Sequence, residues 1–365
     1  MNREEALLVS SSSISGIAWG ANTIVVPIYL TQLGLPPFYV GLLLSASIVF
    51  SSSLGFIFSV LADAHGRKRF AMISRAISAL AFLLLFMRIP YAYAFSSSWG
   101  GGGLVNAMLA EKTSNVENDL SLINSLSIVS SLIGALLPLA LPIRLIFLVD
   151  SSVALASLLL ISMIHERYRG TGRVFFRLSV TMGKFSTEAI IGLGAGIVIP
   201  LMSLWFNLKF NVSARQMSPV FALSDLTLAL TVLAAPRLAA RVGMVRAIVL
   251  THVAAIILLV VLPFSPSFAI ASTVFVVRNA LMNMGNPLLS SMILRLMPEN
   301  QRASATSFIN LLSSIPRAAG PSIGGYLFGE GNLYYPFFIT AGLYSAATAL
   351  FYVFFRNARL ESVKV

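Results

Sequence analysis

The chain has 365 residues, of which 57% are hydrophobic and only 10% are charged, and its formal net charge is +12. Soluble domains rarely combine so much apolar surface with so few charges, so a soluble helical core is not expected. Cysteine is absent, which excludes disulfides, thiolate catalysis and cysteine-ligated metal sites. In so apolar a chain the position of the basic residues is informative, and the net charge gives no reason to expect a nucleic-acid partner.

Long apolar runs follow one another along the chain. The first fills residues 6–62 without one Asp, Glu, Lys, Arg or His, and only the turn sequence GLPP at Gly34 interrupts it. About 20 apolar residues let an α-helix cross the hydrocarbon core, so this interval holds two spans. Hydropathy and turn residues predict an all-α membrane protein with twelve transmembrane helices. The predicted spans are 6–31, 38–62, 70–87, 91–111, 120–141, 145–164, 183–206, 216–237, 246–262, 268–294, 303–327 and 333–355.

The distribution of Lys and Arg predicts the orientation of these spans. With both termini inside, the inner segments hold eighteen of these cations and the outer loops hold four. Cytoplasmic loops carry the excess of Lys and Arg in membrane proteins. We therefore expect a multi-pass protein of the cell inner (plasma) membrane with both termini cytoplasmic. The start of the chain leads directly into a full-length span, so no cleavable signal peptide is expected.

The chain also repeats itself at half its length, which predicts two homologous six-helix bundles. The expected organisation is an N-terminal bundle at 1–165, a basic cytoplasmic linker at 166–182 and a C-terminal bundle at 183–365. Three segments recur in the same order, with offsets of 177, 173 and 182 residues. They are LADAHGRKR at Leu61 with LAARVGMVR at Leu238, VVPIYL at Val25 with VIPLMS at Val198, and VENDLSLINSL at Val116 with PENQRASATSF at Pro298.

Charges gather in the stretch SVLADAHGRKRF at Ser59–Phe70. Gly66 allows a tight turn between two helices, and three cations anchor the loop at the inner lipid surface. Asp63, at a helix end, can pair with Arg67. On physical grounds alone, the other interpretation is a plain solvated loop on the positive inner side.

This stretch resembles the cytoplasmic signature between helices two and three of the major facilitator superfamily, written G-x-L-a-D-r-x-G-r-k. The span count, the half repeat and the linker extend the resemblance to the whole chain. In that superfamily the aspartate holds one conformation closed across the domain interface. The resemblance thus implies that the stretch is a gate motif, with an acidic partner at the end of helix four. The gate residues are Asp63, Gly66, Arg67, Lys68 and Glu111; Leu61 also matches, whereas Ser59 and Ala64 depart from the pattern.

Polar residues inside the predicted spans indicate a substrate cavity. Asn279, Asn283 and Asn286 lie at i, i+4 and i+7 and therefore share one helical face, close to Arg278. On the first span, Asn22 with the neighbouring Trp19 is the polar candidate of the N-terminal half. The alternative is that these amides only hold helices together. By the resemblance, substrate binds near the bilayer midplane between the halves.

Charges within a bilayer are costly and raise a functional hypothesis by default. Asp225 and Arg278 each lie about ten residues, or ~15 Å, from the outer end of their helices, so we expect them at similar depth. They are the predicted proton-coupling pair, with Glu188 as the second candidate carrier; a structural ion pair is the alternative. Arg75 is expected to reach water at its helix end. Asp150 and His252 are assigned to peripheral helices, and Arg317 remains a further candidate.

The leading hypothesis is a secondary active transporter that exports a small organic solute by alternating access in exchange for protons. The GPSIGG segment at Gly320 resembles an exporter pattern of the superfamily, which supports export weakly because that pattern belongs to helix five. The alternatives are uptake, facilitated diffusion or a transport-inactive sensor.

The H-E-x-x-H and nucleotide-binding G-x-x-x-x-G-K-[ST] motifs are absent. We therefore expect no enzyme and no cofactor, a monomer, and as partners the solute, protons and the lipid bilayer. The cavity charges leave open an anion, a zwitterion or a lipophilic cation.

Overall fold

A computed structural model describes residues 2–97, 101–113, 116–166, 183–296 and 302–356. All regular structure in these ranges is helical, which confirms the all-α prediction. The elements are α1 (Arg3–Ser13), α2 (Ser15–Gln32), α3 (Pro37–His65), α4 (Arg67–Phe86), η1 (Pro90–Phe95), α5 (Gly101–Ala110), α6 (Val116–Ala140), α7 (Ile143–Ser162), α9 (Thr187–Val198), η2 (Ile199–Leu201), α10 (Met202–Phe210), α11 (Ala214–Val242), α12 (Met244–Val261), η3 (Leu262–Phe264), α13 (Phe268–Met284), α14 (Asn286–Leu296), α15 (Arg302–Gly329) and α16 (Tyr335–Phe355).

Each predicted span coincides with one helix or with successive helices. In the described part of the chain, nine segments are long and apolar enough to cross a membrane, and α11, bent by 47°, is a tenth. The other two predicted spans correspond to η1 with α5 and to α15. Span ten is interrupted at Gly285, between α13 and α14. Pro287, the second residue of α14, lacks a backbone N–H, as expected near a helix break.

The chain divides into two compact units. Unit 1 comprises Met1–Pro36, Leu42–Val174 and Ser213–Ala222, and unit 2 comprises Pro37–Gly41, Phe175–Val212 and Leu223–Val365. The predicted linker falls almost entirely on residues outside the described ranges. Each unit contains a polar cavity of its own.

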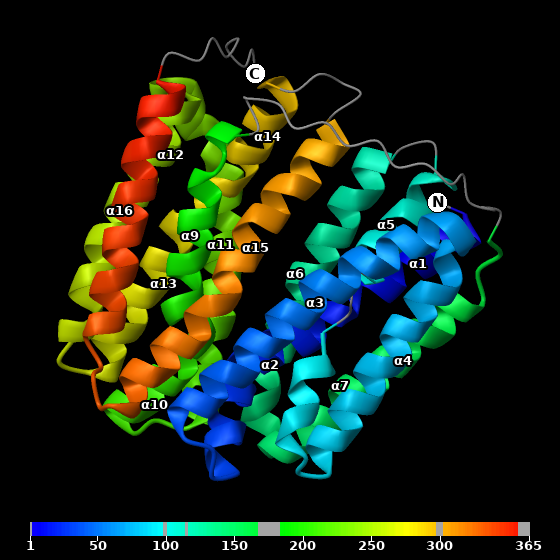
Figure 1. Ribbon diagram of the computed structural model, residues 1–365, viewed down its shortest axis with the longest axis horizontal. Coiled ribbons are helices and arrows are strands. Elements are labelled where there is room, and N and C mark those ends of the chain that lie inside the picture. Colours follow the sequence, from blue (N-terminus) through cyan, green and yellow to red (C-terminus); the bar gives the residue numbers. More distant parts are fainter. Residues whose placement is uncertain (1, 98–100, 114–115, 167–182, 297–301, 357–365) are drawn as a thin grey trace. The chain divides into compact units, whose positions relative to one another are not determined.

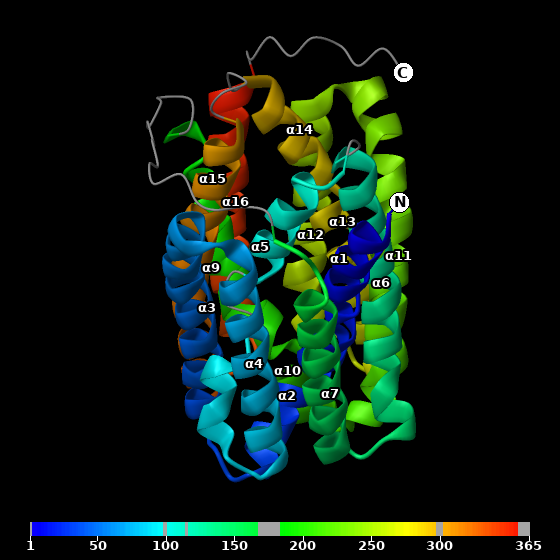
Figure 2. The same ribbon diagram turned by 90° about the vertical axis from the view of Figure 1, so that its right-hand side faces the viewer.

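In unit 1, α2 packs along α6 and α4 packs along α7 (Figure 2). Gly20 of α2 lies directly against the backbone of Ser131, and Gly134 of α6 lies against the backbone of Ile17. A Cβ atom at either glycine would overlap this backbone. Small residues therefore allow the close approach of these two helices, as is common in membranes.

In unit 2, α9 lies between α15 and α16, and α12 packs against α13 and α16 (Figure 1). Gly196 of α9 and Gly320 of α15 meet backbone to backbone. This contact turns one face of α15 toward α9 and determines which α15 side chains point into the unit.

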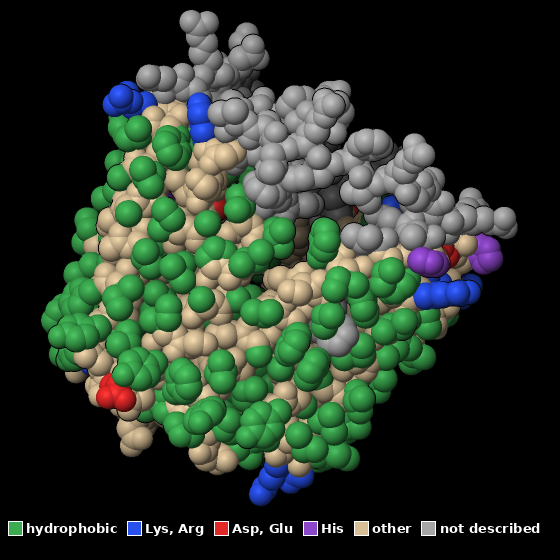
Figure 3. Space-filling model, viewed as in Figure 1, with side chains coloured by type: hydrophobic (Ala, Val, Ile, Leu, Met, Phe, Trp, Pro, Cys, Tyr) green, Lys and Arg blue, Asp and Glu red, His purple; other side chains and the backbone are tan. Residues whose placement is uncertain are grey.

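Hydrophobic side chains are spread over the described part of the visible face, where charged side chains are few (Figure 3). Large apolar side chains such as Phe56, Leu80, Ile257 and Val353 are exposed on the helices. Such a surface would be a liability in water, but it suits the lipid environment that the twelve spans predict.

Candidate functional site

Unit 2 contains a polar cavity of about 400 Å³. It is lined from α9, α12, α13, α14, α15 and α16, so six helices contribute to one site. The polar lining residues are Glu188, His252, Arg278, Asn279, Asn283, Asn286, Ser290, Asn310, Ser313, Arg317 and Tyr344.

Arg278 is the most deeply buried charge of this cavity, with 1% of its surface exposed. Its Cζ atom lies 5.5 Å from the centroid of the Tyr344 ring, a distance at which an aromatic face attracts a cation. Neither Nε nor Nη2 has a hydrogen-bond partner. Both atoms are buried, and a buried donor without a partner is costly.

The three predicted amides form a hydrogen-bonded row along the cavity. Asn286 Nδ2 donates to Asn283 Oδ1 (3.3 Å), and Asn283 Nδ2 donates to Asn279 Oδ1 (2.9 Å). Asn279 Nδ2 donates to Ser224 Oγ of α11 (2.7 Å). The row joins α13 to α11 and keeps the amide face of the helix oriented, which matches the single polar face predicted from the spacing.

Other lining residues extend the predicted set. Glu188 lies in the first turn of α9 and shares the cavity with Arg278. Arg317 of α15 joins them, since α15 approaches α9 closely at Gly196. His252 of α12, predicted to be structural on a peripheral helix, is buried and also lines the cavity. Its helix pairs with both α13 and α16, which no sequence period reveals.

Asp225 is not among the residues that line this cavity, and its pairing with Arg278 stays a prediction. Similar depth on two helices does not determine which way each side chain points around its helix axis. Glu188 is therefore the carboxylate that shares the cavity with Arg278.

Unit 1 contains a second, smaller polar cavity of about 150 Å³. Asp150 of α7 is 0% exposed, and neither of its carboxylate oxygens makes a hydrogen bond that satisfies normal geometry. Arg75 of α4 is 5% exposed and lines the same cavity. The expectations that Arg75 reaches water and that Asp150 is peripheral are therefore wrong. The pairing of α4 with α7, fixed in part by Ser151 Oγ donating to Ala79 O (2.9 Å), turns both charges inward.

The N-terminal candidates belong to this second cavity. Asn22 lines it and faces the Asp150 carboxyl group, and its own Oδ1 is buried without a hydrogen-bond partner. Trp19 lines it too, although 70% of its surface is exposed. The predicted cavity residues thus divide between two cavities, one in each unit.

The gate stretch forms the connection between α3 and α4. Gly66 has φ +100°, a conformation that favours glycine, and it separates the two helices. The side chain of Arg67 forms an ion pair with Glu111, the predicted acidic partner. Lys68 Nζ donates to the carbonyl oxygens of Ser162 (2.7 Å) and Ile164 (2.6 Å) at the end of α7. The side chain of Asp63 lies outside the described part of the structure.

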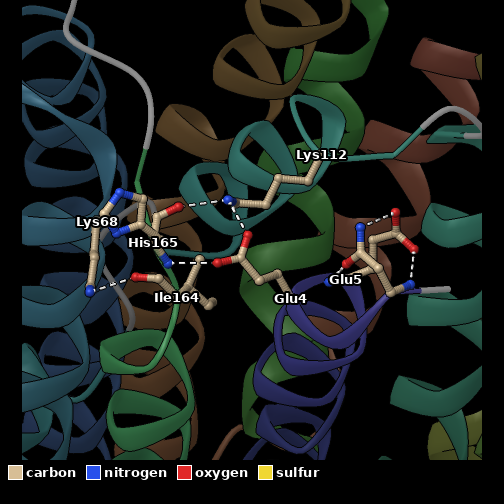
Figure 4. Close-up of polar contacts among 7 residues, drawn as sticks. Glu4, Glu5, Lys68, Lys112, Ile164 and His165 are labelled. Carbon is tan, nitrogen blue, oxygen red and sulfur yellow. Dashed lines mark hydrogen bonds and ion pairs between the residues drawn. The ribbon is translucent and has the colours of Figure 1, made fainter.

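Glu166 and Glu4 complete this end of unit 1. The Glu166 carboxylate accepts the backbone N–H groups of Arg67 and Lys68, the first residues of α4. Figure 4 shows Lys112 Nζ between Glu4 Oε2 and the His165 carbonyl oxygen, each at 2.6 Å. These contacts join α1, α4 and the ends of α5 and α7.

Comparison with protein families settles the class of protein. The model of the Major Facilitator Superfamily matches residues 8–175 and 185–365. The chain belongs to the major facilitator superfamily. It is accordingly a membrane transporter with twelve helices in two six-helix halves, and not an enzyme. Gly320 to Gly324 also spell the G-x-S-x-G pattern of serine hydrolases, but in this superfamily member they lie inside the continuous helix α15 rather than on a strand-to-helix turn.

Solved structures of superfamily transporters share this fold at low sequence identity. The nucleoside transporter NupG is 14% identical, with a TM-score of 0.76 over 98% of this chain and 100% of that one. A bacterial homologue of the human lysosomal transporter Spinster is 13% identical, with a TM-score of 0.78 over 96% and 95%. An auto-inhibited POT family peptide transporter is 13% identical, with a TM-score of 0.77 over 100% and 99%. No curated protein matches the sequence.

Proposed function

We propose that this transporter exports a small organic solute in exchange for protons, with the cavity of unit 2 as part of the solute site. The observation that carries the proposal is the buried guanidinium of Arg278, with unpaired donors, on a polar cavity of about 400 Å³. A polar cavity of this size within apolar helices is typical of a small-molecule site. The nucleoside and peptide transporters with this fold also carry small organic solutes, as their names state.

Proton coupling requires a carboxylate whose protonation depends on the transport cycle. Glu188 supports this assignment because it lines the cavity, and Asp225 remains the candidate predicted from its depth. Intramembrane carboxylates are the usual proton relays of transporters. Export is the proposed direction because of the GPSIGG segment, and both termini are proposed to be cytoplasmic from the distribution of Lys and Arg.

The connection at Gly66 is the proposed gate. Its ion pair of Arg67 with Glu111 and the two carbonyl contacts of Lys68 hold α4 against the ends of α5 and α7. Asp63, one turn before Gly66, keeps the proposed role of closing one conformation.

Transport in liposomes tests the function. A thermal-shift screen against metabolites and drugs selects the solute that stabilises the purified protein most. That solute, radiolabelled, is then offered to liposomes containing the protein, with and without an imposed proton gradient. Accumulation driven by the gradient supports proton-coupled exchange. Equilibration without accumulation would indicate facilitated diffusion, and binding without any flux would indicate a sensor.

A further inference from the structure

We infer that the solute carries an anionic group, a carboxylate or a phosphate, which binds to Arg278 in the cavity of unit 2. That the bound anion is the transported solute rests on the proposed function, whereas anion binding itself follows from the described residues. It decides between the anion, the zwitterion and the lipophilic cation that the sequence left open.

The guanidinium of Arg278 lacks a counter-ion. Its Nε and Nη2 atoms have no hydrogen-bond partner, and no ion pair of Arg278 occurs among the described residues. A buried charge is expensive unless it is paired and hydrogen-bonded. The ring of Tyr344 compensates part of this cost. Two unpaired donors on one planar group of a cavity-lining residue match the two oxygens of a carboxylate or a phosphate.

The amide row adds further donors to the cavity. Each amide has two N–H groups. Asn279 Nδ2 and Asn286 Nδ2 each donate one hydrogen bond in the row, whereas Asn283 Nδ2 donates both to Oδ1 and to the backbone oxygen of Asn279 (2.9 Å each). The Oδ1 atoms of Asn279 and Asn283 already accept a hydrogen bond within the row. One N–H group each of Asn279 and Asn286 remains for a ligand with acceptor atoms.

The net charge of the cavity lining also favours an anion. Two arginines, Arg278 and Arg317, face one carboxylate, Glu188. With His252 neutral, the lining carries one net positive charge. A ligand with one net negative charge would balance it, whereas a lipophilic cation would double the excess.

The spacing of the charges disfavours a compact zwitterion. Tyr344, over which Arg278 lies, contacts α9 at Gly194, where a Cβ atom would be 3.0 Å from Cε1 of the ring. Glu188 precedes Gly194 by six residues, which corresponds to roughly 9 Å along the helix. An α-amino acid, whose charges are only a few bonds apart, would have to bridge this separation to contact both residues.

Charged thiol reagents test the sign of this site, because the chain contains no cysteine of its own. Ser313→Cys places a reporter on the cavity lining, and Ser15→Cys places a control on the cavity of unit 1. In detergent, each is labelled with the anionic sulfonatoethyl and the cationic trimethylammonioethyl methanethiosulfonate. We expect the anion-to-cation rate ratio to be about tenfold higher at Ser313→Cys than at the control. Arg278→Gln should remove this preference, whereas Arg278→Lys and the exposed Arg246→Gln should keep it.

Competition with molecules of matched size tests binding directly. Benzoate should slow the labelling of Ser313→Cys, whereas benzamide and benzylammonium should not, and Arg278→Gln should abolish the protection by benzoate. Equal labelling ratios at both cysteines, or protection by benzylammonium as strong as that by benzoate, would overturn the inference. If Arg278→Gln does not fold, the competition in the Arg278 background still decides. Anion binding without solute flux would refute only the proposed transport, and flux of a cation without anion preference would refute only this inference.

Discussion

Gly196 of α9 and Gly320 of α15 meet so closely that a Cβ atom on Gly196 would lie 3.0 Å from the Cα atom of Gly320. Gly20 of α2 and Gly134 of α6 play the same part in unit 1, where each lies against the backbone of the other helix. These helices are the first and fifth spans of their halves. The half repeat of the sequence therefore reappears as a repeated helix contact, and in unit 2 this contact brings Arg317 to the cavity.

Enlarging Gly320 should separate α9 from α15. We expect Gly320→Val to lower the stability by about 1–3 kcal/mol, the usual cost of overpacking a tight contact. Gly342→Val on α16 is the matched control, because a Cβ atom there meets nothing within 4 Å. Tryptophan fluorescence during heating in detergent measures both. Equal melting temperatures for the two variants would show that the glycine contact does not hold the helices together.

Asp150 and Arg75 should be energetically coupled, because their opposite charges share one cavity of about 150 Å³. Neutralising one leaves the other buried without its counter-charge, so Asp150→Asn and Arg75→Gln should each destabilise the protein. The double variant should lose less free energy of unfolding than the two single variants lose together, and the difference should be about 1 kcal/mol or more. Denaturant unfolding of the four proteins measures this difference. Strict additivity would mean that the two charges do not interact.

Glu166 should stabilise the first turn of α4, since it accepts two backbone N–H groups there and Gly66 offers no side chain for capping. Removing such a cap typically costs about 1 kcal/mol. Hydrogen exchange of the peptide that contains Arg67 and Lys68 should therefore accelerate in Glu166→Ala. The exposed Glu330→Ala should leave it unchanged. Unaltered exchange in Glu166→Ala would argue that the carboxylate does not cap this helix.

Variants of Glu188 and Asp225 should show which of the two carboxylates carries the proton during transport. If Glu188 is the carrier, Glu188→Gln should abolish proton-driven accumulation in liposomes while exchange of the solute persists, because exchange needs no net proton transfer. Asp225→Asn should then retain accumulation. The reverse result would assign the carrier role to Asp225, and gradient-driven transport in both variants would exclude both residues.

Much of this molecule is determined by local sequence. Apolar runs of about 20 residues define the spans because the bilayer thickness sets their length. The spacing of Asn279, Asn283 and Asn286 places them on one face because the helix has 3.6 residues per turn. The turn at Gly66 follows from a backbone conformation that only glycine adopts readily.

Helix packing decided the remainder, because direction around a helix axis depends on the neighbouring helices. From the sequence, Arg75 was expected to reach water and Asp150 to lie on a peripheral helix. In the structure α4 and α7 pack so that both residues line one cavity. The sequence matched Asp225 and Arg278 by depth alone, whereas the contacts of α9 with α15 and α16 place Glu188 and Arg317 on the cavity of Arg278. Sequence alone determined which residues lie within the spans, and only the tertiary structure decided which of them share a cavity, because packing sets the direction of each side chain around its helix axis.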